Sequence, residues 1–329
     1  MKTLGRPNVY LAAARLTETN ASLLAAMHCL DLEAEWLPAK EIGSPLAGDV
    51  ILGRFDVRST LDGVEPGIWD LLRAERNGVR VVNGAQALLL SHDKLASAFR
   101  LRRAGVPHPR TAHVGGQDEH PPLPTPVVLK PRFGTWGRDV FLAESASEYR
   151  CRLKQVRARP WFRRHGVLVQ GLVPPRGFDV RVVVAGGRVV GAVERWAADG
   201  EWRTNVALGG MRRRTIPDAR AVELALVAAR AVGGDLVGVD LLPCGRDDYV
   251  VLEVNGAVDF TDEYALDGRD VFETAILAFA DATRFWPRRK RGFPGEVFDW
   301  ASPAANETIA RAGLGELNRS PAARPPTTS

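Results

Sequence analysis

Short apolar runs alternate with amphipathic segments along the first 90 residues. Most of the apolar runs are bounded by Gly, Pro, Asn or Asp, which predicts β-strands, and the segments between them have helical spacing. Strands that alternate with helices predict a small, doubly wound α/β domain over residues 1–90. The predicted strands are 8–14, 35–38, 49–53 and 79–83, and the predicted helices are 19–30, with Asn20 as N-cap, and 68–77.

The next part of the chain mixes helix and strand without regular alternation. Ser91 is placed to cap a helix that ends at Gly105. A later strand ends at Lys130, a glycine-containing loop follows, and another strand begins at Asp139. A basic helix is predicted at 148–159.

From residue 167 onward the pattern is nearly all strand and turn. The segment 185–188, Ala-Gly-Gly-Arg, is a hairpin turn between two apolar runs. Two further apolar runs form a second hairpin at 237–255, which turns near 246–247. The helices predicted in this part of the chain are 218–232 and 271–280.

The hairpin at 237–255 carries three side chains with oxygen atoms. Glu253 and Asn255 are two apart on one strand, so they point to the same face. With a turn near 246–247, Asp240 lies opposite Glu253. Hard oxygen ligands suit Mg²⁺, which takes its other ligands from water and substrate phosphates. A hairpin with one polar, solvated face has the same pattern, and both interpretations stay open at this point.

Lysine is rare in this chain, which makes two lysines informative. Only six of the 44 Lys and Arg residues are lysines. Lys94 lies in the first turn of a predicted helix, where its charge opposes the helix dipole. Lys130 precedes a glycine loop whose backbone amides can fold over phosphates. Both positions suit phosphate binding, while a solvated lysine and an ordinary hairpin are the alternatives.

Several arginines lie where an anion could bind. Arg54 leaves a strand end, where α/β sheets usually bind ligands. Arg181 shares a strand face with Asp179. Arg203 lies in a polar loop, and the run 212–214 is entirely arginine. The run could attract an acidic substrate or form a solvated face.

Composition excludes several classes of protein. A net charge of +5 without a zinc finger, an aromatic RNA-binding motif or a lysine-rich stripe argues against nucleic acid as a partner. No apolar run is long enough to span a membrane, and the first residues lack the apolar core of a signal peptide. Cys29, Cys151 and Cys244 are too far apart for a zinc motif or a disulfide framework. We expect a cytoplasmic protein with no membrane partner, and a poorly ordered tail at 286–329.

The order of these motifs resembles the ATP-grasp superfamily over about residues 8–280. Its nearest branch is the RimK-like α-L-glutamate ligases and their lysine-biosynthesis relatives. The resemblance implies an α/β (α+β) protein with a doubly wound N-terminal domain, a small central lid domain and a C-terminal antiparallel-sheet domain. The implied boundaries are 1–90, 91–166, 167–285 and, for the tail, 286–329.

The resemblance also implies a role for each motif. Residues 134–137 would form a mobile lid, 170–173 would offer backbone groups to adenine, and Asp179 would approach the ribose. Lys130 and Arg203 would act at the reacting phosphate. The family usually has Gln-Glu at the adenine segment, where this chain has Gln-Gly. The implied ATP contacts are Lys94, Lys130, Gly134, Thr135, Trp136, Gly137, Gln170, Gly171, Leu172, Asp179, Arg203, Thr204 and Asn205; the implied metal ligands are Asp240, Glu253 and Asn255; the candidate substrate contacts are Arg54, Arg181, Arg195 and Arg213.

The implied reaction is amide formation between a carboxylate and an amine. ATP and Mg²⁺ (or Mn²⁺) would be required, an acyl phosphate would be the intermediate, and glutamate or a similar amino acid is the expected substrate. The carboxylate and amine could be small molecules or peptides. An ATP-grasp kinase that phosphorylates a small molecule and a nucleotide-binding module without catalysis are the alternatives. The sequence leaves open whether the chain forms a homo-oligomer.

Overall fold

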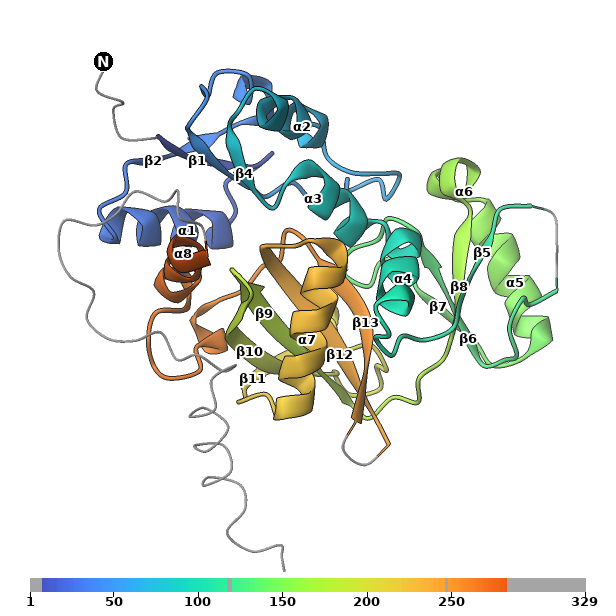
Figure 1. Cartoon of the computed structure of the whole chain (residues 1–329). Coiled ribbons are helices and arrows are strands. Elements are labelled where there is room, and N and C mark those ends of the chain that lie inside the picture. The colour runs from blue at the N-terminus through green and yellow to red at the C-terminus, as the bar shows by residue number, and fades with distance from the viewer. Residues whose placement is uncertain (1–7, 117–119, 246–247, 283–329) are drawn as a thin grey trace, which may run out of the picture. The chain divides into compact units, whose positions relative to one another are not determined.

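The computed structural model describes residues 8–116, 120–245 and 248–282. Within these residues the chain forms three β-sheets (Figure 1). The predicted tail at 286–329 and the predicted hairpin tip at 246–247 lie outside the described residues. No helix among the described residues is long and apolar enough to cross a membrane.

The first sheet is parallel and has helices on both faces, as predicted. Alternate residues of a strand face opposite sides, and β1 divides in this way. Its Leu11 packs with Met27 of the first helix, whereas its Ala12 packs with Leu71 of the second. The strand order is β2-β1-β3-β4. The elements are β1 (Val9–Ala12), α1 (Glu18–Cys29), β2 (Ala34–Leu37), η1 (Ala39–Glu41), β3 (Val50–Gly53), α2 (Ile68–Arg76) and β4 (Arg80–Val82).

Two predicted helix caps are wrong. The side chain of Thr17, not Asn20, caps α1, and it accepts a hydrogen bond from the backbone N–H of Asn20. Ser91 lies inside an unpredicted helix, α3 (Ala85–His92), and donates to the carbonyl of Ala87. The following helix, α4 (Lys94–Arg103), is capped instead by Asp93, which accepts from the N–H groups of the next turn. Lys94 is therefore the first residue of α4.

The central sheet is antiparallel, with the order β5-β8-β6-β7. Two helices cover it through Tyr149 and Trp161, which are fully or almost fully buried. Strand β8 belongs to this sheet, although the predicted boundary at residue 167 groups it with the C-terminal part; the boundaries themselves stay a prediction. The elements are β5 (Thr111–Val114), β6 (Val127–Pro131), β7 (Phe141–Ala143), α5 (Ala146–Arg157), α6 (Pro160–His165) and β8 (Val167–Gly171).

An arm from the first domain reaches the core of the central sheet. Val57 and Leu61, in the segment that follows β3, are buried in the same cluster as the central strands and helices. Asp62 of this arm forms an ion pair with Arg164, and its carbonyl contacts the imidazole of His165. The arm therefore joins the N-terminal domain to the central sheet by both apolar and polar contacts.

The C-terminal sheet has five antiparallel strands in the order β11-β10-β9-β12-β13, and α7 packs across it (Figure 1). Its other helix, α8, shares one continuous core with α1 and β1 of the N-terminal domain. The predicted antiparallel sheet is confirmed. The elements are β9 (Phe178–Ala185), β10 (Arg188–Trp196), η2 (Val206–Leu208), β11 (Met211–Arg214), α7 (Ala219–Val232), β12 (Leu236–Cys244), β13 (Asp248–Asn255), η3 (Asp262–Tyr264) and α8 (Val271–Ala282).

The side chain of Asn83 ties the N-terminal domain to the C-terminal sheet. Asn83 follows β4, is fully buried, and has a left-handed backbone with φ of 54°. Its amide donates to the carbonyls of Leu236 and Gly256 and accepts from the N–H groups of Asp235 and Leu236. One side chain thus satisfies four backbone groups at the start and end of the β12–β13 hairpin.

Candidate active site

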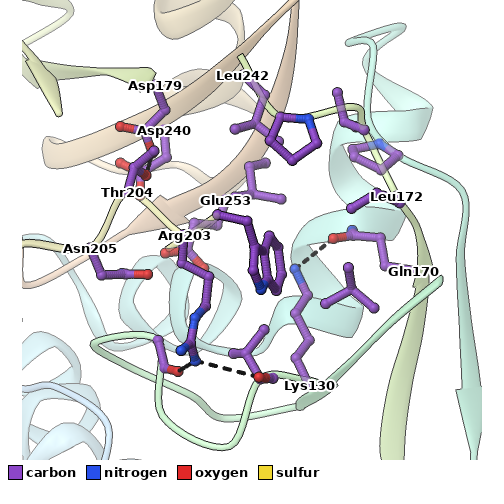
Figure 2. A pocket seen from close by; sticks show the side chains of 18 of the residues that line it. Lys130, Gln170, Leu172, Asp179, Arg203, Thr204, Asn205, Asp240, Leu242 and Glu253 are labelled. Carbon is purple, nitrogen blue, oxygen red and sulfur yellow. Dashed lines mark hydrogen bonds between the residues drawn. The ribbon is translucent and has the colours of Figure 1, made fainter. Parts of the chain in front are cut away.

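A cavity between the central and C-terminal sheets collects most of the predicted site residues. Lys130 on β6 and Gln170 on β8 come from one sheet, whereas Asp179 on β9 and Glu253 on β13 come from the other. Figure 2 shows Lys130 and Gln170 joined by a hydrogen bond at one side of this cavity. The predicted ATP contacts that line it are Lys94, Lys130, Gly134, Thr135, Trp136, Gly137, Gln170, Gly171, Leu172, Asp179, Arg203, Thr204 and Asn205.

The β12–β13 hairpin brings its three oxygen-bearing side chains together as predicted. Asp240 is paired with Glu253 in the strand register, and a bulge follows directly after this pair. The amide nitrogen of Asn255 lies 3.5 Å from a carboxylate oxygen of Asp240 and 3.4 Å from one of Glu253. The two carboxylates therefore converge on a single amide.

These side chains fit a hard divalent cation. No cluster of three or more His, Cys, Asp or Glu side chains that could hold a metal occurs in the described part of the chain. At this hairpin the Asn255 amide offers a third oxygen, which would face the carboxylates after rotation about its side-chain bond. Two carboxylates and one amide are the oxygen ligands that Mg²⁺ accepts.

Arginines neutralise the buried Asp240. The guanidinium of Arg181 donates to both of its carboxylate oxygens, at 2.6 and 2.8 Å, and Arg195 adds a third contact at 2.8 Å. Burial alone would raise the pKa of Asp240, but the two arginines hold that pKa well below its usual range. Arg195 also binds both oxygens of Asp179, which accepts from Thr204 as well. Asp179, predicted near the ribose, is thus already committed to internal partners.

Two lysines reach the same cavity from different elements. The ammonium of Lys130 donates to Gln170 Oε1 at 2.7 Å, and burial lowers the pKa of Lys130 to about 8. The ammonium of Lys94 lies 3.0 Å from a carboxylate oxygen of Glu253 and donates to the carbonyl of Gly134 at 2.6 Å. Lys94 thus connects a candidate metal ligand to the glycine loop.

The glycine loop between β6 and β7 is held by Arg203. Trp136 and Gly137 both have positive φ, at 56° and 69°. A Cβ on Gly137 would lie 2.6 Å from Asn205 Oδ1, so only glycine allows this close approach. Arg203 donates to the carbonyl of Gly137 at 3.0 Å while it pairs with Glu201 at 2.7 Å, and this pairing lowers the pKa of Glu201 to about 2.

The predicted adenine segment offers fewer backbone donors than expected. The N–H of Gly171 donates to the carbonyl of Arg110, and the N–H of Leu172 donates to the carbonyl of Pro126. Both N–H groups are therefore used in hydrogen bonds to other segments of the same protein. Adenine recognition by this segment falls to its remaining backbone groups.

His108 contacts the site but was not found from the sequence. Its Nδ1 lies 2.8 Å from the carbonyl of Val251, and its Nε2 lies 3.3 Å from the amide nitrogen of Gln170. Burial lowers the pKa of His108 to about 4. Its neighbours Pro107 and Pro109 give the segment the pattern of an ordinary turn. Only the tertiary contact with β13 reveals its position.

Two predicted substrate contacts have partners within the chain. Arg54 has a side chain that is 1% exposed, and it donates to Asn20 and to the carbonyl of Val258. The guanidinium of Arg213 lies 4.4 Å from the ring centre of Trp196. Neither arginine is among the residues that line the first cavity or the cavity beside it, and their contact with a substrate stays a prediction.

A second cavity adjoins the first. Both cavities are lined by Trp136 of the glycine loop, by Arg195 and by Glu253. The second cavity is also lined by Arg181 and Asn255, and by Asp56 from the N-terminal domain. Two adjoining cavities that share the Glu253 carboxylate could hold two reactants close together.

Comparison with known proteins gives a consistent picture. Residues 91–272 match the family model described as a RimK-like ATP-grasp domain. The chain is 34% identical to β-citrylglutamate synthase B of Danio rerio over 199 residues, which are 58% of this chain and 48% of that protein, so the chain spans about half the length of this relative. It is 29% identical to a probable α-L-glutamate ligase of Xanthomonas campestris pv. campestris, over 83% of this chain and 94% of that protein.

A solved structure supports the same fold. The crystal structure of a RimK-domain ATP-grasp protein from Sphaerobacter thermophilus matches with a TM-score of 0.60 at 25% identity. The match covers 82% of this chain and 98% of that one. The predicted three-part fold class is confirmed by this likeness.

Proposed function

The chain belongs to the RimK-like ATP-grasp family, and we propose that it is an ATP- and Mg²⁺-dependent ligase that joins a carboxylate to an amine. The observation that carries this proposal is the pair of adjoining cavities that meet at Glu253 and Trp136. One cavity has the lysines and the glycine loop that suit a nucleotide. The other has the charged groups that suit a polar second reactant.

ATP would lie in the first cavity, with its phosphates toward Lys94 and Lys130. Residues 170–173 would border the adenine, and residues 134–137 would close over the phosphates. Asp240, Glu253 and Asn255 would hold Mg²⁺, which supplies positive charge to the phosphate oxygens. Lys94 now pairs with Glu253, so phosphate binding would draw Lys94 away and leave this carboxylate to the metal.

The chemistry needs positive charge because two anions must meet. A substrate carboxylate attacks the γ-phosphorus, the bond to ADP breaks, and an acyl phosphate forms. An uncharged amine then attacks the acyl carbon and phosphate leaves, which completes the amide. Lys130 and Arg203 would stabilise the charge on the transferred phosphoryl group. Closure of the lid would protect the acyl phosphate from water.

The substrates are expected to be amino acids or peptides. Two of the relatives, β-citrylglutamate synthase B and the probable α-L-glutamate ligase, have glutamate in their names. Glutamate or a similar amino acid is our proposed reactant. In the second cavity Arg181 and Arg212 could face its carboxylates, and Asp56 its ammonium group. The cavity therefore suits a zwitterionic amino compound.

The test is a hydroxamate assay with Mg²⁺, ATP, pooled carboxylic amino acids and hydroxylamine as the amine. Wild-type protein should form hydroxamate and ADP, and Glu253→Ala should form neither. The matched control is Glu223→Ala, because Glu223 forms an exposed ion pair with Arg220 on α7. ADP without hydroxamate would indicate a kinase. ATP binding without ADP formation would indicate a nucleotide-binding module instead.

A further inference from the structure

Three hydrogen-bonded side chains lie behind the nucleotide cavity and end at Lys130. Lys130 on β6 donates to Gln170 on β8, and Gln170 contacts His108, which in turn contacts β13. We infer that His108 is a positioning residue that fixes the amide of Gln170, so that the amide oxygen holds the Lys130 ammonium in place for the ATP phosphates. The inference rests on the proposed function.

Each hydrogen bond in this series has only one possible direction. A carbonyl can only accept, so the Nδ1 of His108 carries the proton that it donates to Val251, at 2.8 Å. The Nε2 of the neutral ring is then an acceptor. An ammonium can only donate, so the oxygen of Gln170 must face Lys130 and its NH₂ group must face His108, as observed.

Thr111 completes the support of the Gln170 amide. Its hydroxyl donates to the carbonyl of Pro109 at 2.9 Å and accepts from Gln170 Nε2 at 2.9 Å. His108 and Thr111 are thus the two acceptors for the two amide hydrogens. Without the imidazole acceptor, one buried N–H of Gln170 has no partner, and rotation of the amide would turn donors toward the ammonium.

His108 also attaches this group of side chains to strand β13 of the C-terminal sheet. The carbonyl of Pro107 accepts from the N–H of Val251, and the carbonyl of Val251 accepts from His108. Val251 precedes Glu253 by two residues on the same strand. Hydrogen bonds through His108 and Gln170 therefore connect Lys130, on the central sheet, to the strand that carries Glu253, on the C-terminal sheet.

Two substitutions separate the two contacts of His108. His108→Gln can present a side-chain oxygen to Gln170 but gives up the contact with Val251. His108→Asn is shorter and can donate to Val251 but cannot reach Gln170. Binding of the nonhydrolysable analogue AMP-PNP with Mg²⁺, measured by calorimetry, should weaken about tenfold in His108→Asn. It should change by less than about twofold in His108→Gln.

A double-mutant cycle and a control complete the test. Gln170→Met should weaken AMP-PNP binding as His108→Asn does, and the double variant should be no weaker than Gln170→Met alone. His113→Asn is the control, because His113 contacts the carbonyl of His165 on the same sheet without touching this series. The inference would be overturned if His108→Asn bound AMP-PNP as tightly as wild type. It would also be overturned if both His108 variants lost the same amount of AMP-PNP affinity. A wild type that binds no AMP-PNP would overturn the proposed function itself.

Discussion

At the scale of single residues, Lys130 combines burial with a function that needs charge. Burial lowers its pKa from an ordinary 10.5 to about 8. Below pH 8 the ammonium is charged and can attract phosphate, whereas above pH 8 it loses its proton. We expect the affinity for AMP-PNP to be highest near pH 7 and to fall as the pH rises through 8 toward 9.

The pH dependence can be checked by calorimetry across pH 6.5–9.5 on wild type and two variants. Lys130→Met should bind weakly with little pH dependence, because the titrating group is gone. Lys40→Met should behave as wild type, since Lys40 forms only an exposed pair with Glu41. A wild-type profile that stays flat through pH 9 would contradict the prediction.

The free energy of unfolding should respond to pH in the opposite sense. A lysine with a lowered pKa binds fewer protons when folded than when unfolded between pH 8 and 10.5. Stability rises with pH where the unfolded state binds more protons. Nucleotide-free protein should therefore gain stability from Lys130 as the pH rises through this window, and Lys130→Met should lack that gain in denaturant titrations.

The residues that could be predicted from the sequence were those fixed by local geometry. Asp240, Glu253 and Asn255 follow from the two-residue period of a strand and the length of one hairpin. Arg54 occupies an equally suggestive strand end, but its long side chain folds inward to the carbonyl of Val258. His108 acquires its role only from a contact 143 residues away in sequence.

At the scale of elements, the glycine loop between β6 and β7 approaches Asn205 closely at one residue. Gly137 has φ of 69°, and a Cβ would meet Asn205 at 2.6 Å, whereas Gly200 has φ of 76° with nothing within 4 Å of an added Cβ. Gly137→Ala should suffer both backbone strain, about 1–2 kcal/mol, and the clash. Gly200→Ala should suffer the strain alone.

The comparison of these two alanine variants tests whether the glycine loop acts as a lid during the reaction. We expect Gly137→Ala to lower the rate of hydroxamate formation by about tenfold more than Gly200→Ala, since a displaced lid exposes the intermediate to water. The thermal unfolding temperature should fall further in Gly137→Ala, which adds the clash to the strain, so both rates are measured at a temperature where both variants are folded. Equal rates in both variants would mean that the approach to Asn205 does not matter for the reaction.

Element boundaries were predicted less well than element types. Both Ser91 and Asp93 are good N-cap residues, and the choice of Ser91 was wrong. Asp93 gains a further partner in Arg132, which donates to both of its carboxylate oxygens from the loop after β6. No local pattern shows this partner. The strand β8 was likewise predicted as a strand, but its pairing with β6 could not be predicted, because pairing is not a local property.

At the scale of the whole molecule, the central sheet relies on the arm from the N-terminal domain. Leu61 is 2% exposed within the central core. Leu61→Ala should lower the free energy of unfolding by about 2–4 kcal/mol, because it leaves a cavity. Denaturant titration would measure this loss, and hydrogen exchange should report faster opening of β6 and β8.

A matched control for this prediction is Leu46→Ala. Leu46 is 73% exposed, so its truncation should change stability by less than about 0.5 kcal/mol. If Leu61→Ala were equally neutral, the arm would contribute no stability to the central sheet. Because the two residues have the same chemistry, the difference between the variants measures burial alone.

The buried amide of Asn83 has a consequence for how this protein can evolve. Its partners lie at residues 235–256, so the first 90 residues and the C-terminal hairpin must be inherited as a matched set. A crossover between genes of this family could replace the first 90 residues without the C-terminal hairpin, or the reverse. It would then leave several buried backbone groups without hydrogen-bond partners. We therefore expect viable recombination breakpoints to avoid the interval between Asn83 and Gly256. Chimeras joined at residue 90 between this chain and a relative should be rescued when position 83 keeps its asparagine.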